Sequence, residues 1–465
     1  MFRDLKREMV GRCRRELVLF IFAVGVLAAL IAPGALSRAQ AGGRRVEGVQ
    51  PYSLSQPRVP ALLRPPDGGR PLTWESEFRK QPSFRFSCFL DTGASRLMLS
   101  VSTRGRLDVK PTGQTITDWG IGGTEEFGVS EPYRICVADT DADTSNEEYF
   151  QHCIGCIFQL RRKSPNMEGA MSGEMSKVLD DTAGGLGISP DELMQMFAPR
   201  MNIVGTPFLQ RHVAFLDPRP LKEMYGAVLQ MMQGMSGGGS REEKGPGGRL
   251  DSLFRLLEHS SVGGGTGQIG VDISPADASY SPPAITVPLR MRNMEEEPLP
   301  VTQARVPFVP NATLHNGGRS LQLDLLLDTG GAISLVSRDV ARELGVELGQ
   351  PRFRAPVLGI GGEGTTELKG YWLDRLRVPT RSGEPLVFEK VPFFVVDIDR
   401  LEGTLGMNLL LPSAYMNMDV QQMQKNPLGL LGSLESGPMP FRRIIIDLPH
   451  RRLGLEPARQ EGRTN

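Results

Sequence analysis

Two short stretches of the chain place an aspartate in nearly the same surroundings. Residues 89–95 read FLDTGAS and residues 326–332 read LLDTGGA, so each has an apolar run, then Asp-Thr-Gly and a small residue. Hydrolysis of an amide needs a base to activate water and an acid to protonate the leaving nitrogen. Two carboxylates that share one proton supply both, because like charges held close together cannot both ionise. We therefore expect Asp91 and Asp328 to meet in one site.

A predicted strand leads into each aspartate and would fix its position. Apolar residues occupy every second position before both motifs, which is typical of a β-strand. These residues are Phe84, Phe86, Cys88 and Leu90 in the first stretch and Leu321, Leu323, Leu325 and Leu327 in the second. Gly93 and Gly330 then allow a tight turn beside each carboxylate. After the second motif, Ser337 as N-cap and Gly345 as terminator predict a helix.

Two further landmarks follow both motifs in the same order. The first is a glycine-rich hairpin tip, which can close over an extended peptide and exclude water. Its residues are Trp119, Gly120, Ile121, Gly122 and Gly123 in the first half and Gly359, Ile360, Gly361 and Gly362 in the second. Trp119 either caps the site or packs as a tip-flanking aromatic. The second landmark is an apolar-apolar-Gly segment ending at Gly205 and at Gly406. An internal duplication of about 150 residues explains this order.

These motifs resemble the aspartic proteases of the retropepsin and pepsin type, over about residues 80–220 and 285–457. The resemblance implies a mainly β fold with short helices, in which two retropepsin-like β-barrel lobes form a bilobal acid protease. It implies Asp91 and Asp328 as the catalytic pair, whose shared proton is general chemistry of that family. It also implies that Thr92 and Thr329 hydrogen-bond across to the opposite active-site loop. Glycine-rich tips in both halves resemble a retropepsin dimer joined into one chain. Gly331 stands where the family usually has Ala, Ser or Thr.

Composition and pattern divide the chain into a series of segments. Residues 1–41 are expected to form a signal peptide or an anchor, and residues 42–80 a Pro- and Gly-rich lead-in. The first lobe spans residues 81–233 and contains an insertion at 139–200. A flexible linker at 234–284 leads to the second lobe at 285–458, and residues 459–465 form a tail.

The first 41 residues have the pattern of an export signal. Basic residues precede an uncharged apolar run at 17–32, and small residues follow at 39–41. The run is shorter than the roughly 20 residues of a membrane-spanning helix, which favours cleavage over anchoring. We expect a periplasmic, extracellular or membrane-anchored protein with its catalytic part outside the cytoplasm. Export would expose the cysteines to an oxidising compartment, so disulfides are predicted among Cys88, Cys136, Cys153 and Cys156, with the pairing open.

Overall composition excludes some classes of protein. The chain has 465 residues, 53 of them basic and 53 acidic, and its formal net charge is zero. This balance argues against a nucleic-acid binder. Metal is the weaker interpretation of the cysteines, because a zinc site usually draws on two close pairs of ligands. We expect no metal, no cofactor, a monomer, and membrane contact only through an N-terminal anchor.

The predicted function is an exported aspartic endopeptidase that cuts protein or peptide substrates bound in extended conformation, best at acidic pH. One alternative is a non-catalytic peptide-binding protein on the same fold. Another is a membrane-anchored protein in which each lobe pairs with a lobe of a second chain.

Overall fold

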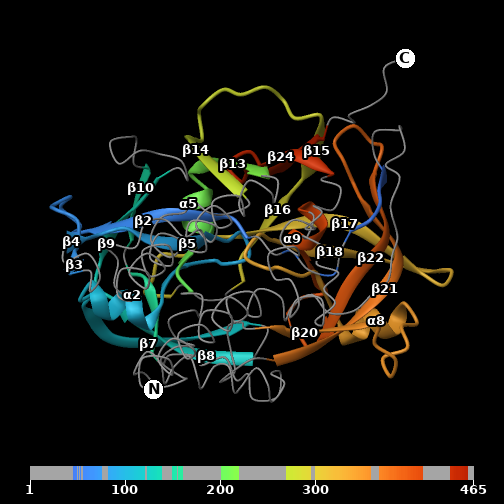
Figure 1. Ribbon diagram of the computed structural model, residues 1–465, viewed down its shortest axis with the longest axis horizontal. Coiled ribbons are helices and arrows are strands. Elements are labelled where there is room, and N and C mark those ends of the chain that lie inside the picture. The colour runs from blue at the N-terminus through green and yellow to red at the C-terminus, as the bar shows by residue number, and fades with distance from the viewer. Residues whose placement is uncertain are drawn as a thin grey trace, which may run out of the picture.

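The computed structural model describes residues 45–49, 51, 53, 56–75, 82–120, 123–138, 149–153, 155–160, 201–218, 269–294, 299–357, 366–398, 400–411 and 440–458. These residues form a mainly β fold with short helices, as the sequence predicted (Figure 1). In the described part of the chain no helix is long and apolar enough to span a membrane.

The strands of the first half are β1 (Arg45–Val46), β2 (Arg58–Arg64), β3 (Trp74–Glu75), β4 (Pro82–Ser83), β5 (Phe86–Leu90), β6 (Leu97–Leu99), β7 (Pro111–Gly120), β8 (Gly123–Ser130), β9 (Tyr133–Val137), β10 (Tyr149–Cys153), β11 (Ile157–Gln159), β12 (Ile203–Val204) and β13 (His212–Pro218). Those of the second half are β14 (Ile269–Pro275), β15 (Ile285–Pro288), β16 (Arg290–Arg292), β17 (Val306–Asn316), β18 (Arg319–Asp328), β19 (Leu335–Ser337), β20 (Phe353–Val357), β21 (Thr366–Val378), β22 (Leu386–Val396), β23 (Gly403–Gly406), β24 (Phe441–Asp447) and β25 (Arg452–Pro457). The helices are α2 (Val101–Arg106), α5 (Thr206–Leu209), α8 (Arg338–Glu343) and α9 (Met407–Leu410).

The chain builds two large sheets, one mainly from each half, and β1 from near the N-terminus pairs with β22 in the second sheet. The first-half sheet has the strand order β10-β9-β2-β5-β12-β6-β11-β8-β7. The second-half sheet has the order β1-β22-β19-β23-β18-β17-β21-β20, with β16 paired to β17. The strands β3 and β4 form a separate two-stranded ribbon.

The same sequence of pairings surrounds both Asp-Thr-Gly motifs. In the first half β5 lies parallel to β12, β12 antiparallel to β6, and β6 parallel to β11. In the second half β18 lies parallel to β23, β23 antiparallel to β19, and β19 parallel to β22. The helices α2 and α8 also begin alike, because the side chains of Ser100 and Ser337 accept hydrogen bonds from backbone N–H groups of the first turn.

A five-stranded sheet joins the two halves, in the order β14-β13-β24-β25-β15. The first-half strand β13 lies between the second-half strands β14 and β24, and Phe215 lies opposite Ile445 in its pairing with β24. Arg443 also forms a two-point ion pair with Asp217 across these strands, at 2.7 Å for both nitrogen–oxygen contacts. In Figure 1 this sheet lies at the top between the two halves, whereas β8 and β20 lie at the bottom.

One apolar core runs through both halves. The strand β18 shows how it forms, because Leu323, Leu325 and Leu327 alternate along the strand and are all buried in this core. Alternation therefore leaves Gln322, Asp324, Leu326 and Asp328 on the other face of the strand, the face that carries the catalytic candidate.

The predicted segment boundaries need correction in three places. Within the lead-in 42–80, β2 pairs with both β5 and β9 and is buried, so this part belongs to the first-half sheet. Within the insertion 139–200, β10 and β11 also pair into that sheet. Within the linker 234–284, residues 269–275 form β14 rather than flexible chain. Residues 1–41, the remaining linker up to 268 and the tail 459–465 lie outside the described residues.

Candidate active site

Asp91 and Asp328 come together at the boundary between the two halves. Asp91 directly follows β5, and Asp328 is the last residue of β18. Their carboxyl groups are neighbours, close enough for each to shift the pKa of the other. A methyl group added to Gly93 would lie 2.8 Å from Oδ1 of Asp328 and 3.2 Å from Oδ1 of Asp91, so both carboxyl groups border the same point. The structure thus brings together the two aspartates that the sequence singled out.

Backbone N–H groups hold each carboxyl group in place. The N–H of Gly93 donates to Oδ1 of Asp91 at 2.7 Å. The N–H of Gly331 donates to Oδ1 of Asp328 at 2.8 Å. Gly93 lies two residues after Asp91 and Gly331 three residues after Asp328, so each loop orients its own carboxyl group through a backbone N–H, from slightly different positions.

The two threonines of the motifs link the opposing loops. The hydroxyl of Thr92 donates to the carbonyl oxygen of Leu327 and that of Thr329 donates to the carbonyl oxygen of Leu90, both at 2.6 Å. The backbone N–H of each threonine donates to the hydroxyl of the other at 3.0 Å. All four bonds are buried, and they match the cross-loop bonding that the family resemblance implied.

Because the glycines of the motifs have no side chain, the carboxylates can occupy the space beside them. A Cβ on Gly330 would lie 2.3 Å from Cγ of Asp91, and a Cβ on Gly331 would lie 2.5 Å from Oδ2 of Asp328. The departure from the family pattern at Gly331 therefore removes an atom that would press on Asp328. Gly205 and Gly406 pack as closely against the motif loops, because a Cβ on either would lie 2.2 Å from a backbone carbonyl oxygen.

Burial and mutual contact raise the pKa of both carboxyl groups. Loss of hydration raises the pKa of Asp328 well above its usual value, and the neighbouring charge of Asp91 raises it further. Burial also raises the pKa of Asp91, although hydrogen bonds from Gly93 and Asp328 oppose the effect. The proton belongs to the pair, which retains it at pH values where an exposed aspartate is ionised.

The first glycine-rich tip is a hairpin, as predicted. Its strands β7 and β8 pair up to Gly120 and Gly123, and Gly123 has φ of 109°, a conformation that favours glycine. Trp119 packs against an apolar cluster formed by Val306, Phe308, Leu326 and Leu401 of the second half. Ile121, Gly122 and the second tip, Gly359, Ile360, Gly361 and Gly362, lie outside the described residues.

Three polar residues near the site escaped the sequence analysis. Arg96, only 3% exposed, forms an ion pair with Asp118 and so ties the first hairpin to the loop after Asp91. Gln56 donates from Nε2 to the carbonyl oxygen of Gly330. The only indication of the ion pair in the sequence was the position of Arg96, directly after the small residues of the first motif. Nothing in the proline-rich segment around Gln56 indicated its role.

The cysteines whose side chains the structure describes do not form the predicted disulfides. Cys88, Cys136 and Cys156 are buried and carry no disulfide. Cys88 lies opposite Val59 of β2, and Cys136 lies opposite Leu62. These positions of β2 are three residues apart, so the two thiols project from opposite faces of the sheet and cannot meet. Cys153 has no described side chain. In the described part of the chain, no three His, Cys, Asp or Glu side chains gather as metal ligands.

Comparison with known proteins identifies part of the chain. A family model described as Aspartyl protease matches residues 312–409. A retropepsin-like aspartic protease from Rickettsia conorii aligns at 20% identity over 21% of this chain and 76% of that chain, with a TM-score of 0.16. No curated protein matches the chain. Residues 312–409, which contain Asp328 and the second Asp-Thr-Gly motif, thus form an aspartyl protease domain.

Proposed function

We propose that the chain is an aspartic endopeptidase in which Asp91 and Asp328 form one catalytic pair. The observation that carries the proposal is the meeting of two partly buried carboxyl groups, which border the same point beside Gly93 and whose pKa values are both raised. A pair with one proton can act as base and acid in the same step. The matching strand pairings around both motifs support two lobes that arose by duplication.

The reaction follows from the single shared proton. The ionised carboxylate takes a proton from a water molecule, whose oxygen forms a bond to the peptide carbonyl carbon. The electron pair of the carbonyl bond moves to its oxygen, which takes the proton of the other carboxyl group. Breakdown of this tetrahedral species transfers a proton to the leaving nitrogen and breaks the carbon–nitrogen bond. Hydrogen bonds from Gly93 and Gly331 keep the pair in position throughout.

The hairpin of β7 and β8 supports an extended peptide as the substrate. Its tip residues Gly120 and Gly123 carry no side chains, and Trp119 reaches an apolar cluster that includes Leu326, two residues before Asp328. Closure of such a tip over a peptide would exclude water from the reaction. We also propose, from the apolar segment at 17–32, that the protein is exported by a cleaved signal or held by an anchor.

Substitution of the two aspartates tests the proposal. We expect Asp91→Asn and Asp328→Asn each to reduce peptide cleavage by about 100-fold or more, the contribution of acid–base catalysis. Circular dichroism should show an unchanged fold. The exposed Asp339 provides a matched control, because Asp339→Asn should cleave as the unchanged chain does. Full activity of either active-site variant would reject the shared pair. Binding of a statine-type inhibitor without any cleavage would favour a non-catalytic peptide-binding protein.

A further inference from the structure

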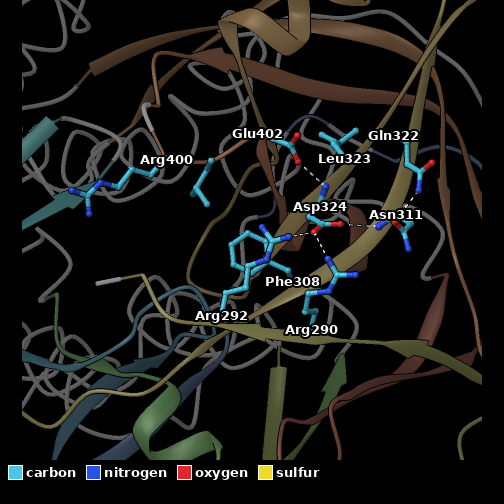
Figure 2. Close-up of a pocket in the computed structure, with 10 residues that line it drawn as sticks. Arg290, Arg292, Phe308, Asn311, Gln322, Leu323, Asp324, Arg400 and Glu402 are labelled. Atoms are coloured by element: carbon cyan, nitrogen blue, oxygen red, sulfur yellow. Dashed lines mark hydrogen bonds and ion pairs between the residues drawn. The ribbon is translucent and has the colours of Figure 1, made fainter. Parts of the chain in front are cut away.

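A polar cavity of about 470 Å³ lies against β16, β17 and β18 (Figure 2). Charged and amide side chains form most of its lining, and Phe308, Leu323 and Leu401 are its apolar residues. The charged and amide residues are Arg290, Arg292, Asn311, Gln322, Asp324, Arg400 and Glu402.

This cavity adjoins the candidate active site. Phe308 and Leu401 also belong to the apolar cluster that contains Leu326 and contacts Trp119. Asp324, Leu326 and Asp328 share one face of β18, because side chains alternate along a strand. Four residues separate Asp324 from Asp328, which corresponds to about 13 Å along the strand. An extended peptide over the catalytic pair would therefore place a side chain in the cavity about two to four residues from the bond that is cut.

The carboxylate of Asp324 is already neutralised inside the cavity. Arg290 donates to its Oδ2 at 3.0 Å, and Arg292 donates to the same oxygen. The backbone N–H of Asn311 donates to Oδ1 at 2.9 Å, an approach allowed by the bulge of β17 at this residue. Asp324 is 11% exposed, whereas Arg290 is 53% and Arg292 42% exposed, so both guanidinium groups keep N–H donors that face the cavity.

Because Arg400 also lines it, the cavity has a net positive charge. Three arginines and two carboxylate residues, Asp324 and Glu402, line the cavity. Glu402 accepts the backbone N–H of Asp324 at 2.8 Å. Figure 2 shows Arg400 apart from this network, and it forms no ion pair with another residue of the described part of the chain. The lining therefore includes one guanidinium without a carboxylate partner, directed away from the already neutral cluster around Asp324, and a carboxylate is the group it would bind.

We propose that this cavity binds an acidic side chain of the peptide substrate, and that Arg400 selects it. The proposal rests on the proposed peptidase function and specifies its substrate class. An Asp or Glu two to four residues from the cleaved bond would reach Arg400, with the remaining donors of Arg290 and Arg292 at the edge of the cavity.

A set of capped peptides tests the selection with the full chain. Each peptide is acetylated and amidated and carries one Glu or one Gln at a chosen position, from four residues before the cleaved bond to four residues after it. We expect kcat/KM to be about tenfold higher for Glu than for Gln at one of these positions, the value of one charge-assisted hydrogen bond. In Arg400→Ala this ratio should fall towards one, and in Arg400→Glu it should fall below one. Arg342→Ala, an exposed arginine of α8, should keep the ratio.

The possible results distinguish failure of the proposed cavity function from failure of the proposed peptidase function. Cleavage with equal rates for Glu and Gln at every position would overturn the proposal and leave the peptidase function intact. No cleavage of any peptide would reject the peptidase function itself. Peptides with a free C-terminus are tested as well. If kcat/KM rises only when the C-terminal carboxylate is free, the selection of an acidic side chain is also overturned. A preference retained in Arg400→Ala would show that Arg400 is not the selecting residue.

Discussion

Thr92 and Thr329 exchange hydrogen bonds across the boundary between the two halves of the chain. The N–H of each donates to the hydroxyl of the other at 3.0 Å, and each hydroxyl then donates to a carbonyl oxygen of the opposite strand. Neither active-site loop can therefore complete its hydrogen bonds alone. The relative position of Asp91 and Asp328 depends on this link, since each aspartate directly precedes one of the threonines.

Replacement of one threonine by a residue of equal shape should destabilise the protein. In Thr92→Val the carbonyl oxygen of Leu327 and the N–H of Thr329 both lose their partner while they stay buried. A buried polar group without a partner costs about 1–3 kcal/mol, so we expect the free energy of unfolding to fall by about 2–5 kcal/mol. Denaturation in urea measures the change. Thr92→Ser keeps the hydroxyl and should retain most of the stability, and equal losses in both variants would contradict the argument.

The proposed catalytic pair, Asp91 and Asp328, should make the folded chain less stable as pH rises, the opposite of the usual effect of aspartates. Burial raises the pKa of Asp328 in the folded chain, so the native state keeps a proton that the unfolded state has lost. The stability that this proton confers is complete below the unfolded pKa of about 3.9 and is lost as pH rises through the higher folded pKa. Activity should fall over the same range, because the acid of the pair is lost.

Unfolding in urea at a series of pH values measures this dependence. We expect the free energy of unfolding to decline from pH 4 upwards, at a rate set by the difference in bound protons, about 1.4 kcal/mol per pH unit for one proton. Asp328→Asn removes the titrating group and should flatten the curve. An equal slope in the unchanged chain and in the variant would assign the decline to other groups.

Much of the arrangement around the aspartates could be predicted from the sequence, because its signals are local. Alternating leucines before Asp328 predicted β18, and Ser337 and Gly345 predicted α8. The glycines at 120 and 123 predicted the hairpin tip. Each of these follows from a short pattern and the backbone geometry that it favours.

Long-range pairing accounts for what the sequence could not indicate. The strand β2 lies in a segment rich in proline and looked like exposed chain, yet it is buried between β5 and β9. The cysteines suggested disulfides, but which face of the sheet each occupies depends on the register of β2 against its neighbours. The cavity around Asp324 draws its residues from four separate segments, so no single pattern marks it.

Gly330 should tolerate no side chain. In Gly330→Ala the new methyl group would lie 2.3 Å from both Cγ and Oδ2 of Asp91, so the carboxylate must leave its position. We expect kcat to fall by about 100-fold, since a displaced catalytic group loses its alignment with the reacting atoms. Gly105 in α2 is the control, because a Cβ there meets nothing within 4 Å. Gly105→Ala should keep activity and gain about 0.5–1 kcal/mol in stability. Normal activity of Gly330→Ala would contradict the observed packing.

Asp447, in the sheet that joins the two halves, should change the free energy of unfolding with pH in the direction opposite to Asp328. Its carboxylate has no exposed surface and accepts hydrogen bonds from Arg452, Tyr280 and Nδ1 of His450. Burial alone would raise the pKa of Asp447, but the bonds from Tyr280 and Arg452 outweigh burial and lower it. The stabilisation is therefore present above the unfolded pKa and is lost as pH falls through the lower folded pKa. Asp447→Asn leaves Arg452 without its carboxylate, so we expect a loss of about 3–5 kcal/mol at pH 7 in urea denaturation. The same variant should also lose less stability on acidification than the unchanged chain does, and a steeper acid loss would show that Asp447 is not the group responsible.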